Sequence, residues 1–220
     1  MNPADYDAWY DSERGRWIGE TEYRLLLNEL APRPGDRTLD VGCGTGWFTR
    51  RLAHDLPGPV TGLDLNADSL SFAAERNATS FYVQADARRL PFADNAFDCV
   101  CSITALCFVD NWSLALEEIV RVTRRRFAIG MLNRHSLLWL EKGRDGGMGA
   151  YRGAHWLTPA ELRRALEPLP VTRPALASAV FLPGGSTVAR WLESAVPNRF
   201  LHGAFLLVAG EKRHDAKSSG

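Results

Sequence analysis

The sequence predicts a single α/β domain built on a doubly wound, mostly parallel sheet with helices on both faces. One reason is a regular alternation of short apolar runs with segments of helical periodicity, the pattern of consecutive βαβ units. A second is the length of 220 residues, which fits one domain at roughly 150 residues per domain. A third is a glycine-rich turn between the first apolar run and the helix after it, a position where open α/β sheets bind ligands.

Periodicity places most elements in chain order. Tyr23, Leu26, Leu27 and Leu30 have the i, i+3, i+4, i+7 spacing of an amphipathic helix, which we expect over 21–30. The strands expected after it are the apolar runs 38–41, 60–64, 81–84, 98–103 and 127–131, with helices between them at 47–56, 68–76 and 113–122. The arginine run 124–126 is expected to be a solvated connection between the last helix and the last strand of this series.

The last third of the chain begins irregularly and then regains order. Residues 133–156 are glycine-rich and longer than a usual connection, and such loops more often serve function than structure. Thr158 as N-cap, followed by Pro159 and Glu161, forms a capping box that predicts the start of a helix. The elements expected to complete the sheet are a helix over 187–195 and a late edge strand over 204–209.

Composition and charge favour an enzyme that acts on small molecules. Lys and Arg number 26, as do Asp and Glu, so the formal net charge is zero and the chain lacks the positive field that binds nucleic acid or anionic membranes. No stretch approaches the roughly 18 apolar residues of a membrane span, and the N-terminus has no basic start with an apolar core. We expect a cytoplasmic monomer or homodimer with a small-molecule substrate and no nucleic-acid partner.

The four cysteines fit a reducing compartment. Cys99, Cys101 and Cys107 are crowded into one apolar segment, with Cys43 apart from them, whereas a disulfide framework would be spread along a small secreted domain. Together they could in principle bind a soft metal or a metalloid. Small buried core residues are the simpler interpretation, so no metal site is expected.

The glycine-rich turn predicts a nucleotide-type ligand with a cationic part. The segment TLDVGCGTGWF places Gly42, Gly44 and Gly46 between a strand and a helix, so that a ligand can approach the backbone closely. A dinucleotide site has the spacing GxGxxG and sets a pyrophosphate on the helix N-terminus. Here the spacing is GxGxG, and the preceding carboxylate of Asp40 would repel a pyrophosphate and attract a cation.

Three blocks in order carry a resemblance to a known family. They are LDVGCGTG, TGLDLN and QADARRLPFADNAFDCV, within about residues 39–131. The sequence resembles the class I, Rossmann-like S-adenosylmethionine-dependent methyltransferases, in particular the type 11 group of small-molecule methyltransferases, and looks similar to the C-methyltransferases of quinone biosynthesis. The resemblance implies a seven-stranded sheet, S-adenosylmethionine as cofactor and S-adenosylhomocysteine as product.

The resemblance also implies the cofactor-binding residues, all at the carboxyl ends of parallel strands. Asp40 and the glycine-loop backbone would hold the methionine part, Asp64 the two ribose hydroxyls, and Asp86 the adenine amino group. Leu65 would pack on the adenine. The full implied set is Asp40, Gly42, Cys43, Gly44, Gly46, Asp64, Leu65, Asp86, Ala87, Ile103 and Thr104, of which the last two would line the reactive end. The alternative for the three aspartates is that each only caps a turn or a helix.

Two segments are expected to flank the cofactor site. Residues 1–34 are expected to form a helical lid, 35–211 the cofactor-binding domain with 133–157 as a substrate-side insertion, and 212–220 a disordered tail. His135 and His155 at the ends of the insertion are the first candidates for contacting the substrate. The other substrate or lid candidates are Tyr6, Trp9, Tyr10, Trp17, Arg134 and Tyr151, of which the aromatic residues before 20 could instead be permanently packed.

Methyl transfer to a small molecule is the predicted function, with two alternatives. One is a protein that binds the cofactor for sensing or assembly without catalysis, and the other is a nicotinamide-dependent oxidoreductase, which the loop spacing and Asp40 disfavour. The chain has no GxSxG, HExxH or CxxC motif, and no Asn/Asp-Pro-Pro-Tyr run follows the fourth strand, so it does not resemble methyltransferases of nucleic-acid bases or protein amides. The sequence does not identify the acceptor, the atom methylated or a general base.

Overall fold

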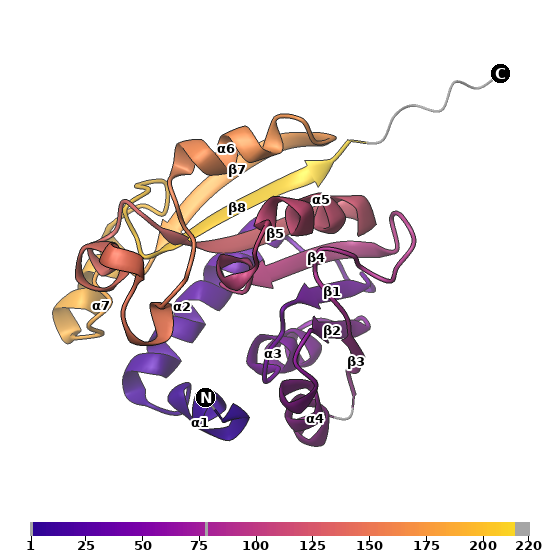
Figure 1. The fold of residues 1–220 in the computed structure, drawn as a ribbon, viewed down its shortest axis with the longest axis horizontal. Coiled ribbons are helices and arrows are strands. Elements are labelled where there is room, and N and C mark those ends of the chain that lie inside the picture. The colour runs from indigo at the N-terminus through magenta and orange to yellow at the C-terminus, as the bar shows by residue number, and fades with distance from the viewer. Residues whose placement is uncertain (1, 78, 214–220) are drawn as a thin grey trace.

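The structure, a computed structural model, describes residues 2–77 and 79–213 and is centred on one mixed sheet (Figure 1). Seven strands follow the order β3-β2-β1-β4-β5-β8-β7, and the two-residue strand β6 pairs with β5 beside this path. The bounds are β1 Thr38–Val41, β2 Val60–Asp64, β3 Phe81–Gln84, β4 Phe97–Ile103, β5 Thr123–Asn133, β6 Trp156–Leu157, β7 Val171–Ala179 and β8 Phe205–Lys212.

The sheet is parallel from β3 to β6 and antiparallel only where β8 joins β5 and β7. The helices are α1 Pro3–Trp9, α2 Glu13–Leu30, α3 Trp47–Asp55, α4 Ala67–Arg76, α5 Trp112–Val122, α6 Pro159–Leu166 and α7 Thr187–Ala195. In Figure 1, α5 and α6 cover one face of the sheet, and α2 and α3 cover the other. The predicted doubly wound α/β fold is confirmed.

Local capping explains where two helices start. The capping box predicted at Thr158 is present: its hydroxyl accepts the Glu161 N–H at 3.2 Å, and the Glu161 carboxylate accepts the Thr158 N–H at 2.7 Å. The helix predicted over 21–30 begins earlier, at Glu13, because the Ser12 hydroxyl caps it by accepting the Gly15 N–H at 3.0 Å. The helical periodicity therefore reaches back into the aromatic segment that the sequence assigned to the lid.

The C-terminal part of the sheet contains a strand that the sequence did not reveal. Strand β7 includes Pro174 and several alanines, a composition with weak strand propensity, and pairing with β8 fixes it. Strand β8 ends at Lys212, one residue inside the expected tail, and 214–220 of that tail lie outside the described residues. A short helical turn, Leu106–Phe108, lies between β4 and α5. Between β5 and β6 the chain forms three more, at Trp139–Gly143, Arg144–Gly146 and Gly149–Tyr151.

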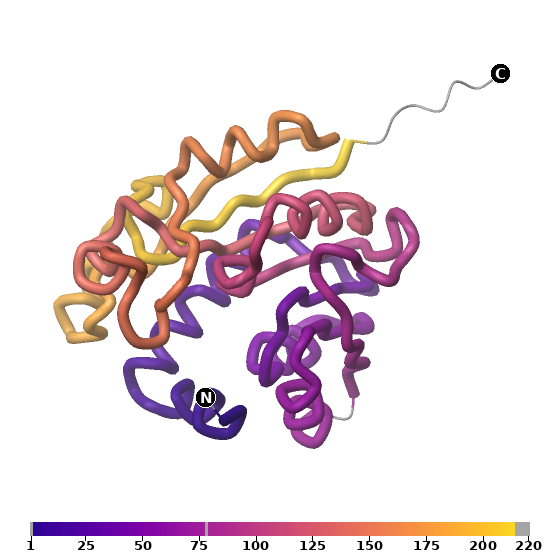
Figure 2. The backbone as a smooth tube through the Cα atoms, in the orientation of Figure 1, coloured from indigo at the N-terminus to yellow at the C-terminus, as the bar shows by residue number. Residues whose placement is uncertain are grey.

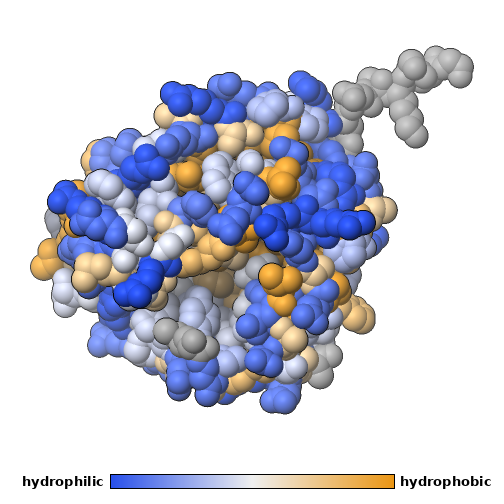
Figure 3. Space-filling view, viewed as in Figure 1, coloured by the Kyte–Doolittle hydropathy of each residue, from blue (hydrophilic) through white to orange (hydrophobic). Residues whose placement is uncertain are grey.

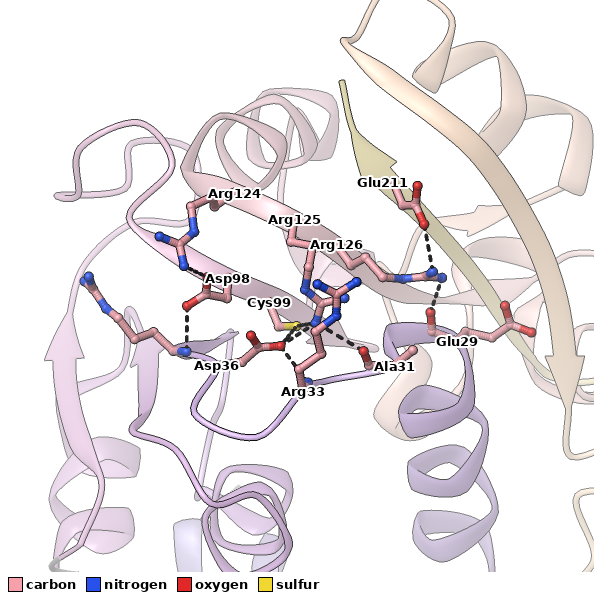
Figure 4. A network of polar contacts seen from close by, with 11 residues as sticks. Glu29, Ala31, Arg33, Asp36, Asp98, Cys99, Arg124, Arg125, Arg126 and Glu211 are labelled. Carbon is pink, nitrogen blue, oxygen red and sulfur yellow. Dashed lines mark hydrogen bonds and ion pairs between the residues drawn. The ribbon is translucent and has the colours of Figure 1, made fainter. Parts of the chain in front are cut away.

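The arginine run 124–126 is part of β5 and not a solvated connection (Figure 4). Arg124 pairs with Asp98 and Arg125 with Asp36, while Arg126 donates to the Glu29 carbonyl oxygen at 2.6 Å and to Glu211 at 3.3 Å. The interpretation from sequence was wrong because β5 already begins at Thr123 and pairs with β4 there through a bulge. Each arginine therefore meets a different carboxylate or carbonyl. This network joins the amino ends of β4 and β5 to the end of α2.

We predict that Asp36→Asn destabilises the protein by about 2–3 kcal/mol, because the half-buried Arg125 guanidinium would lose its carboxylate. Asp36 also accepts the Arg33 N–H at 2.7 Å. Urea unfolding followed by circular dichroism measures the effect. Asp94→Asn is the control, because its carboxylate is 69% exposed on Arg121, which keeps Glu118. Equal losses for the two variants would contradict a stabilising role of the network.

Candidate functional site

A cavity of about 560 Å³ opens at the carboxyl ends of β1, β2, β3 and β4. The space-filling view shows a hollow near the centre of this face (Figure 3). Eight of the residues predicted to bind the cofactor line this cavity: Gly42, Gly44, Asp64, Leu65, Asp86, Ala87, Ile103 and Thr104. Asp40 and Cys43 line a smaller adjoining cavity of about 30 Å³. Gly46 lines neither, and serves instead as N-cap of α3 with φ +79°.

The glycine loop is crowded by protein at one glycine and faces open space at another. At Gly42, with φ +75°, a Cβ would lie 2.2 Å from the Cβ of Ala105, so the loop can pass the end of β4 only without a side chain. At Gly44, with φ +53°, no atom lies within 4 Å of the Cβ position. The loop is therefore packed against protein at Gly42 and faces open space at Gly44.

The loop amides are already used within the protein. The Gly42 and Cys43 N–H groups donate to the Leu63 carbonyl oxygen at 2.7 and 2.9 Å, and the Gly44 N–H donates to the Asp64 carboxylate at 2.8 Å. Asp64 also accepts the Asn66 N–H at 2.9 Å, which fixes its orientation at the cavity. The loop can thus offer a ligand carbonyl oxygens and carboxylates, acceptors that suit a cationic or hydroxyl-bearing group.

Asp40 is a buried carboxyl beside the loop. Its side chain is 1% exposed and accepts the Thr49 hydroxyl at 2.7 Å. Burial, together with the nearby charge of Asp64, raises the pKa of Asp40 to about 7. A cation that reached the smaller cavity would lower this pKa again, because it stabilises the ionised form.

Asp86 faces the cavity, but its carboxylate is engaged by a residue that the sequence analysis did not single out. The Arg88 guanidinium contacts both oxygens, at 2.7–3.1 Å, and the Arg88 N–H also donates to Asp86 at 2.9 Å. The Arg88 guanidinium holds the pKa of Asp86 below its usual range. Arg88 and Leu65 both line the cavity, and Leu65 is 64% exposed.

Helix α1 closes the opposite side of the site. Tyr6 lines both cavities, and Tyr10 stacks on Trp47 with ring centroids 4.5 Å apart. The helix is held by Asp7, which is buried and accepts two hydrogen bonds from Arg50 at 2.8 and 3.0 Å. Arg50 in turn donates to the carbonyl oxygen of Thr45 in the glycine loop at 2.7 Å. The N-terminal segment is thus tied to the loop, and α1 packs against α4 (Figure 2).

The remaining aromatic candidates of the N-terminal segment lie outside the two cavities. Trp9 packs edge-on against Tyr10 at 4.9 Å and is 37% exposed. Trp17 is buried beside Gly185, away from the glycine loop.

The substrate-side candidates are not brought together. His155 lies at the rim, where its Nε2 is 3.9 Å from the carboxylate of Asp110, a residue of the larger cavity. His135 is exposed and lies beside the ring of His202. Arg134 is held by the Trp156 carbonyl oxygen at 2.8 Å and by Glu161.

Comparison with known proteins finds a related family for the first half of the sheet. The sequence profile of the family described as "Methyltransferase domain" matches residues 39–126. Residues 39–126 thus match a methyltransferase domain. This match spans β1 to the start of β5, the strands whose ends form the cavity, and it argues against the nicotinamide-dependent alternative.

Relatives of the methyltransferase domain have different names and sizes. The malonyl-[acyl-carrier protein] O-methyltransferase of Erwinia pyrifoliae is 37% identical over 133 residues, covering 57% of this chain and 50% of the relative. An uncharacterised protein of Mycobacterium tuberculosis is 37% identical over 175 residues, covering 74% and 56%. The chain spans about half the length of the relatives it matches.

Among solved structures, an S-adenosylmethionine-dependent methyltransferase of Thermotoga maritima, described as a possible histamine N-methyltransferase, has the same fold. Its TM-score is 0.73 with 21% sequence identity, and the alignment covers 96% of each chain.

The residues at the cavity of the methyltransferase domain fit the cofactor. The open position at Gly44 leaves room beside the loop, and the carboxylate of Asp64 is held at the cavity wall. The hydroxyl of Thr45, a residue that lines both cavities and is 2% exposed, has no hydrogen-bond partner. A buried hydroxyl left without a partner is costly, and a polar ligand in the cavity would satisfy it.

Two residues that line the cavities were not found from the sequence. Thr45 lies between Gly44 and Gly46, and Arg88 follows Asp86 by two positions. Both residues are therefore inside the sequence blocks that carry the family resemblance.

Two further observations describe the part of the chain that the structure covers. Within 2–77 and 79–213, no helix is long and apolar enough to cross a membrane. In the same ranges, no group of three or more His, Cys, Asp or Glu side chains could hold a metal ion. The four cysteines are free thiols, three of them buried as expected and Cys43 half-buried against Gly62 and the loop.

We predict that Asp64→Ala weakens binding of S-adenosylhomocysteine by about 1.5–3 kcal/mol, because charge-assisted hydrogen bonds to two ribose hydroxyls are lost. Isothermal titration calorimetry measures the dissociation constant. Asp68→Ala is the control, because Asp68 lies exposed in the first turn of α4, close to Asp64 in sequence. Unchanged affinity in Asp64→Ala would show that this carboxylate only orders the loop.

A second prediction concerns pH. We expect the α-ammonium group of the cofactor to favour the ionised form of Asp40. Below the Asp40 pKa of about 7, binding of the cofactor therefore releases a proton. The affinity for the cofactor falls by up to about tenfold for each pH unit below that pKa. Calorimetry between about pH 5.5 and 7.5, in buffers that differ in ionisation enthalpy, measures both effects. In Asp40→Asn the pH dependence disappears, and a wild-type affinity that is flat over this range would contradict the assignment.

Proposed function

We propose that this protein transfers the methyl group of S-adenosylmethionine to a small-molecule acceptor. The observation that carries the proposal is the convergence of the glycine loop, Asp64 and the end of β4 on one cavity that Tyr6 of α1 also lines. Methyl transfer is an in-line displacement that needs alignment of two reactants and exclusion of water more than it needs a protein acid or base. A cavity closed by an aromatic helix meets both needs.

The cofactor supplies the electrophilic methyl group when it is bound. Of the protein residues, Asp40 and the loop would hold the methionine end, Asp64 the ribose, and Leu65 with Arg88 the adenine. Ile103 and Thr104 end β4 at the cavity, and Thr104 has φ +50°, a strained backbone that turns the chain sharply there. The acceptor would approach over this turn, between α2 and the insertion 133–157.

The acceptor class is the open part of this proposal. The names of the relatives refer to a malonyl-[acyl-carrier protein] and to histamine, two chemically different acceptors. We also propose the cytoplasm as the compartment, which the free thiols support.

Turnover tests the proposal. The protein is incubated with S-adenosylmethionine and a panel of quinols, phenols, thiols, amines, carboxylic acids and metalloids, and S-adenosylhomocysteine is quantified. We expect acceptor-dependent product formation that is lost in Asp64→Ala. Binding of S-adenosylhomocysteine without turnover on any compound would instead support the non-catalytic, cofactor-sensing alternative.

We further propose that residues 2–34 act as a lid whose closed form is held by Asp7. Asp7→Asn removes half of the ion pair with Arg50 that connects α1 to the glycine loop, at a cost of about 2–4 kcal/mol to closure. Hydrogen exchange across 5–17 measures it. We expect fast exchange in the free protein, protection with S-adenosylhomocysteine, and weakened protection in Asp7→Asn.

Asp5→Asn is the control for the lid, because Asp5 is exposed on the same helix. Equal protection of 5–17 with and without S-adenosylhomocysteine would mean that the segment is a fixed wall.

A further inference from the structure

Tyr6 lies where the two cavities of the site meet. It lines the larger cavity and also the smaller one. The other residues common to both cavities are Gly42, Gly44 and Thr45 of the glycine loop and Ile103 at the end of β4. The boundary of this junction therefore comes from the edge of the sheet and from one aromatic side chain of α1.

The two cavities offer different groups to a ligand. Asp64, Leu65 and Asp86 line the larger cavity alone, which we assign to the adenosine part of the cofactor. Asp40 lines the smaller cavity alone, which we assign to the methionine end. In S-adenosylmethionine the sulfonium connects these two parts. A cofactor that reaches both cavities therefore has its sulfur at the junction, beside Tyr6.

The Tyr6 ring is supported by protein and still accessible at the junction. It packs edge-on against Tyr10 with ring centroids 6.0 Å apart, and Tyr10 stacks on Trp47. The next residue, Asp7, is bound by Arg50 at 2.8 Å. Tyr6 nevertheless keeps 44% of its surface accessible. A ring held in this way presents aromatic surface to a ligand that enters the junction.

The charges around the junction favour a cation. Asp40 lines the cavity on one side of it, and Asp64 lines the cavity on the other. Of the described residues that line the two cavities, Arg88 is the one Lys or Arg, and the Asp86 carboxylate already neutralises it. The face of an aromatic ring adds a further attraction for positive charge.

Methyl transfer removes the charge that this junction favours. The sulfur of S-adenosylmethionine is a sulfonium with one positive charge, whereas the sulfur of S-adenosylhomocysteine is a neutral thioether. The two molecules have the same adenosine and the same α-ammonium, so Asp64 and Asp40 contact identical groups in both. The side chain that adjoins the sulfur is therefore the one that responds most directly to the difference.

We infer that Tyr6 biases the site towards S-adenosylmethionine and against S-adenosylhomocysteine, by placing its ring against the sulfonium centre. The inference rests on the proposed function through its cofactor alone and holds for any acceptor. A sulfonium beside a tyrosine ring gains an attraction that the thioether lacks. This bias favours exchange of the spent cofactor for a new one and limits inhibition by the product.

Binding of three ligands tests the inference without an acceptor. Calorimetry measures the dissociation constants of S-adenosylmethionine, of S-adenosylhomocysteine and of sinefungin, an analogue with an ammonium in place of the methylsulfonium. Tyr6→Leu should lower the ratio of the S-adenosylhomocysteine constant to each of the other two by about threefold or more. Contacts common to the ligands cancel in these ratios. Tyr6→Gln, a second variant without the ring, should lower both ratios, and Tyr6→Phe should keep them.

Trp9→Leu is the matched control, because it makes the same type of change on α1 at a residue that is 37% exposed and lines neither cavity. Its ratios should equal those of the wild type. Unchanged ratios in Tyr6→Leu, or an equal fall in Trp9→Leu, would overturn the inference. A loss of affinity in Tyr6→Leu that is the same for all three ligands would also overturn it, because the ring would then only cover the cavity. A wild-type protein that binds none of the three would refute the proposed function instead.

Discussion

Every group of the site depends on the parallel pairing of β1, β2, β3 and β4, because parallel strands end at the same edge of a sheet. The register that sets Asp40 opposite Gly62 and Cys101 brings residues from four separate stretches of sequence to one cavity. Gly42 makes this possible at the most crowded point, where the loop passes the end of β4 without room for a side chain. The cavity is thus a consequence of strand direction, and the side chains around it determine the ligand.

Three carboxyl groups at this edge have three different environments. Asp86 is neutralised by Arg88, Asp64 accepts two backbone N–H groups, and Asp40 is buried with a hydroxyl as its hydrogen-bond donor. The pKa of Asp40 is raised to about 7, because burial without a nearby cation disfavours the ionised form. An acid of this kind responds strongly to a cationic ligand.

The N-terminal segment completes the site and is coupled to it through charge. The Asp7–Arg50 pair connects α1 to α3, and Arg50 continues the connection to the carbonyl oxygen of Thr45. An aromatic wall held this way can change position only if the ion pair breaks or moves with the loop. Closure of the site and order of the glycine loop are therefore linked by one guanidinium group.

The sequence by itself determined the parts of this protein whose signals are local. Apolar alternation located six strands, and capping chemistry located the helix at Thr158. The glycine loop with Asp40 and Asp64 located the edge of the sheet where the cavities lie. The tertiary structure decided what depends on partners distant in sequence. Pairing with β8 fixed β7 despite its weak propensity, and carboxylates from three segments recruited the arginines of β5. The fold also brought Asp7 of α1 to Arg50 of α3. Charge pairing and burial join residues far apart in the chain, and no local pattern records them.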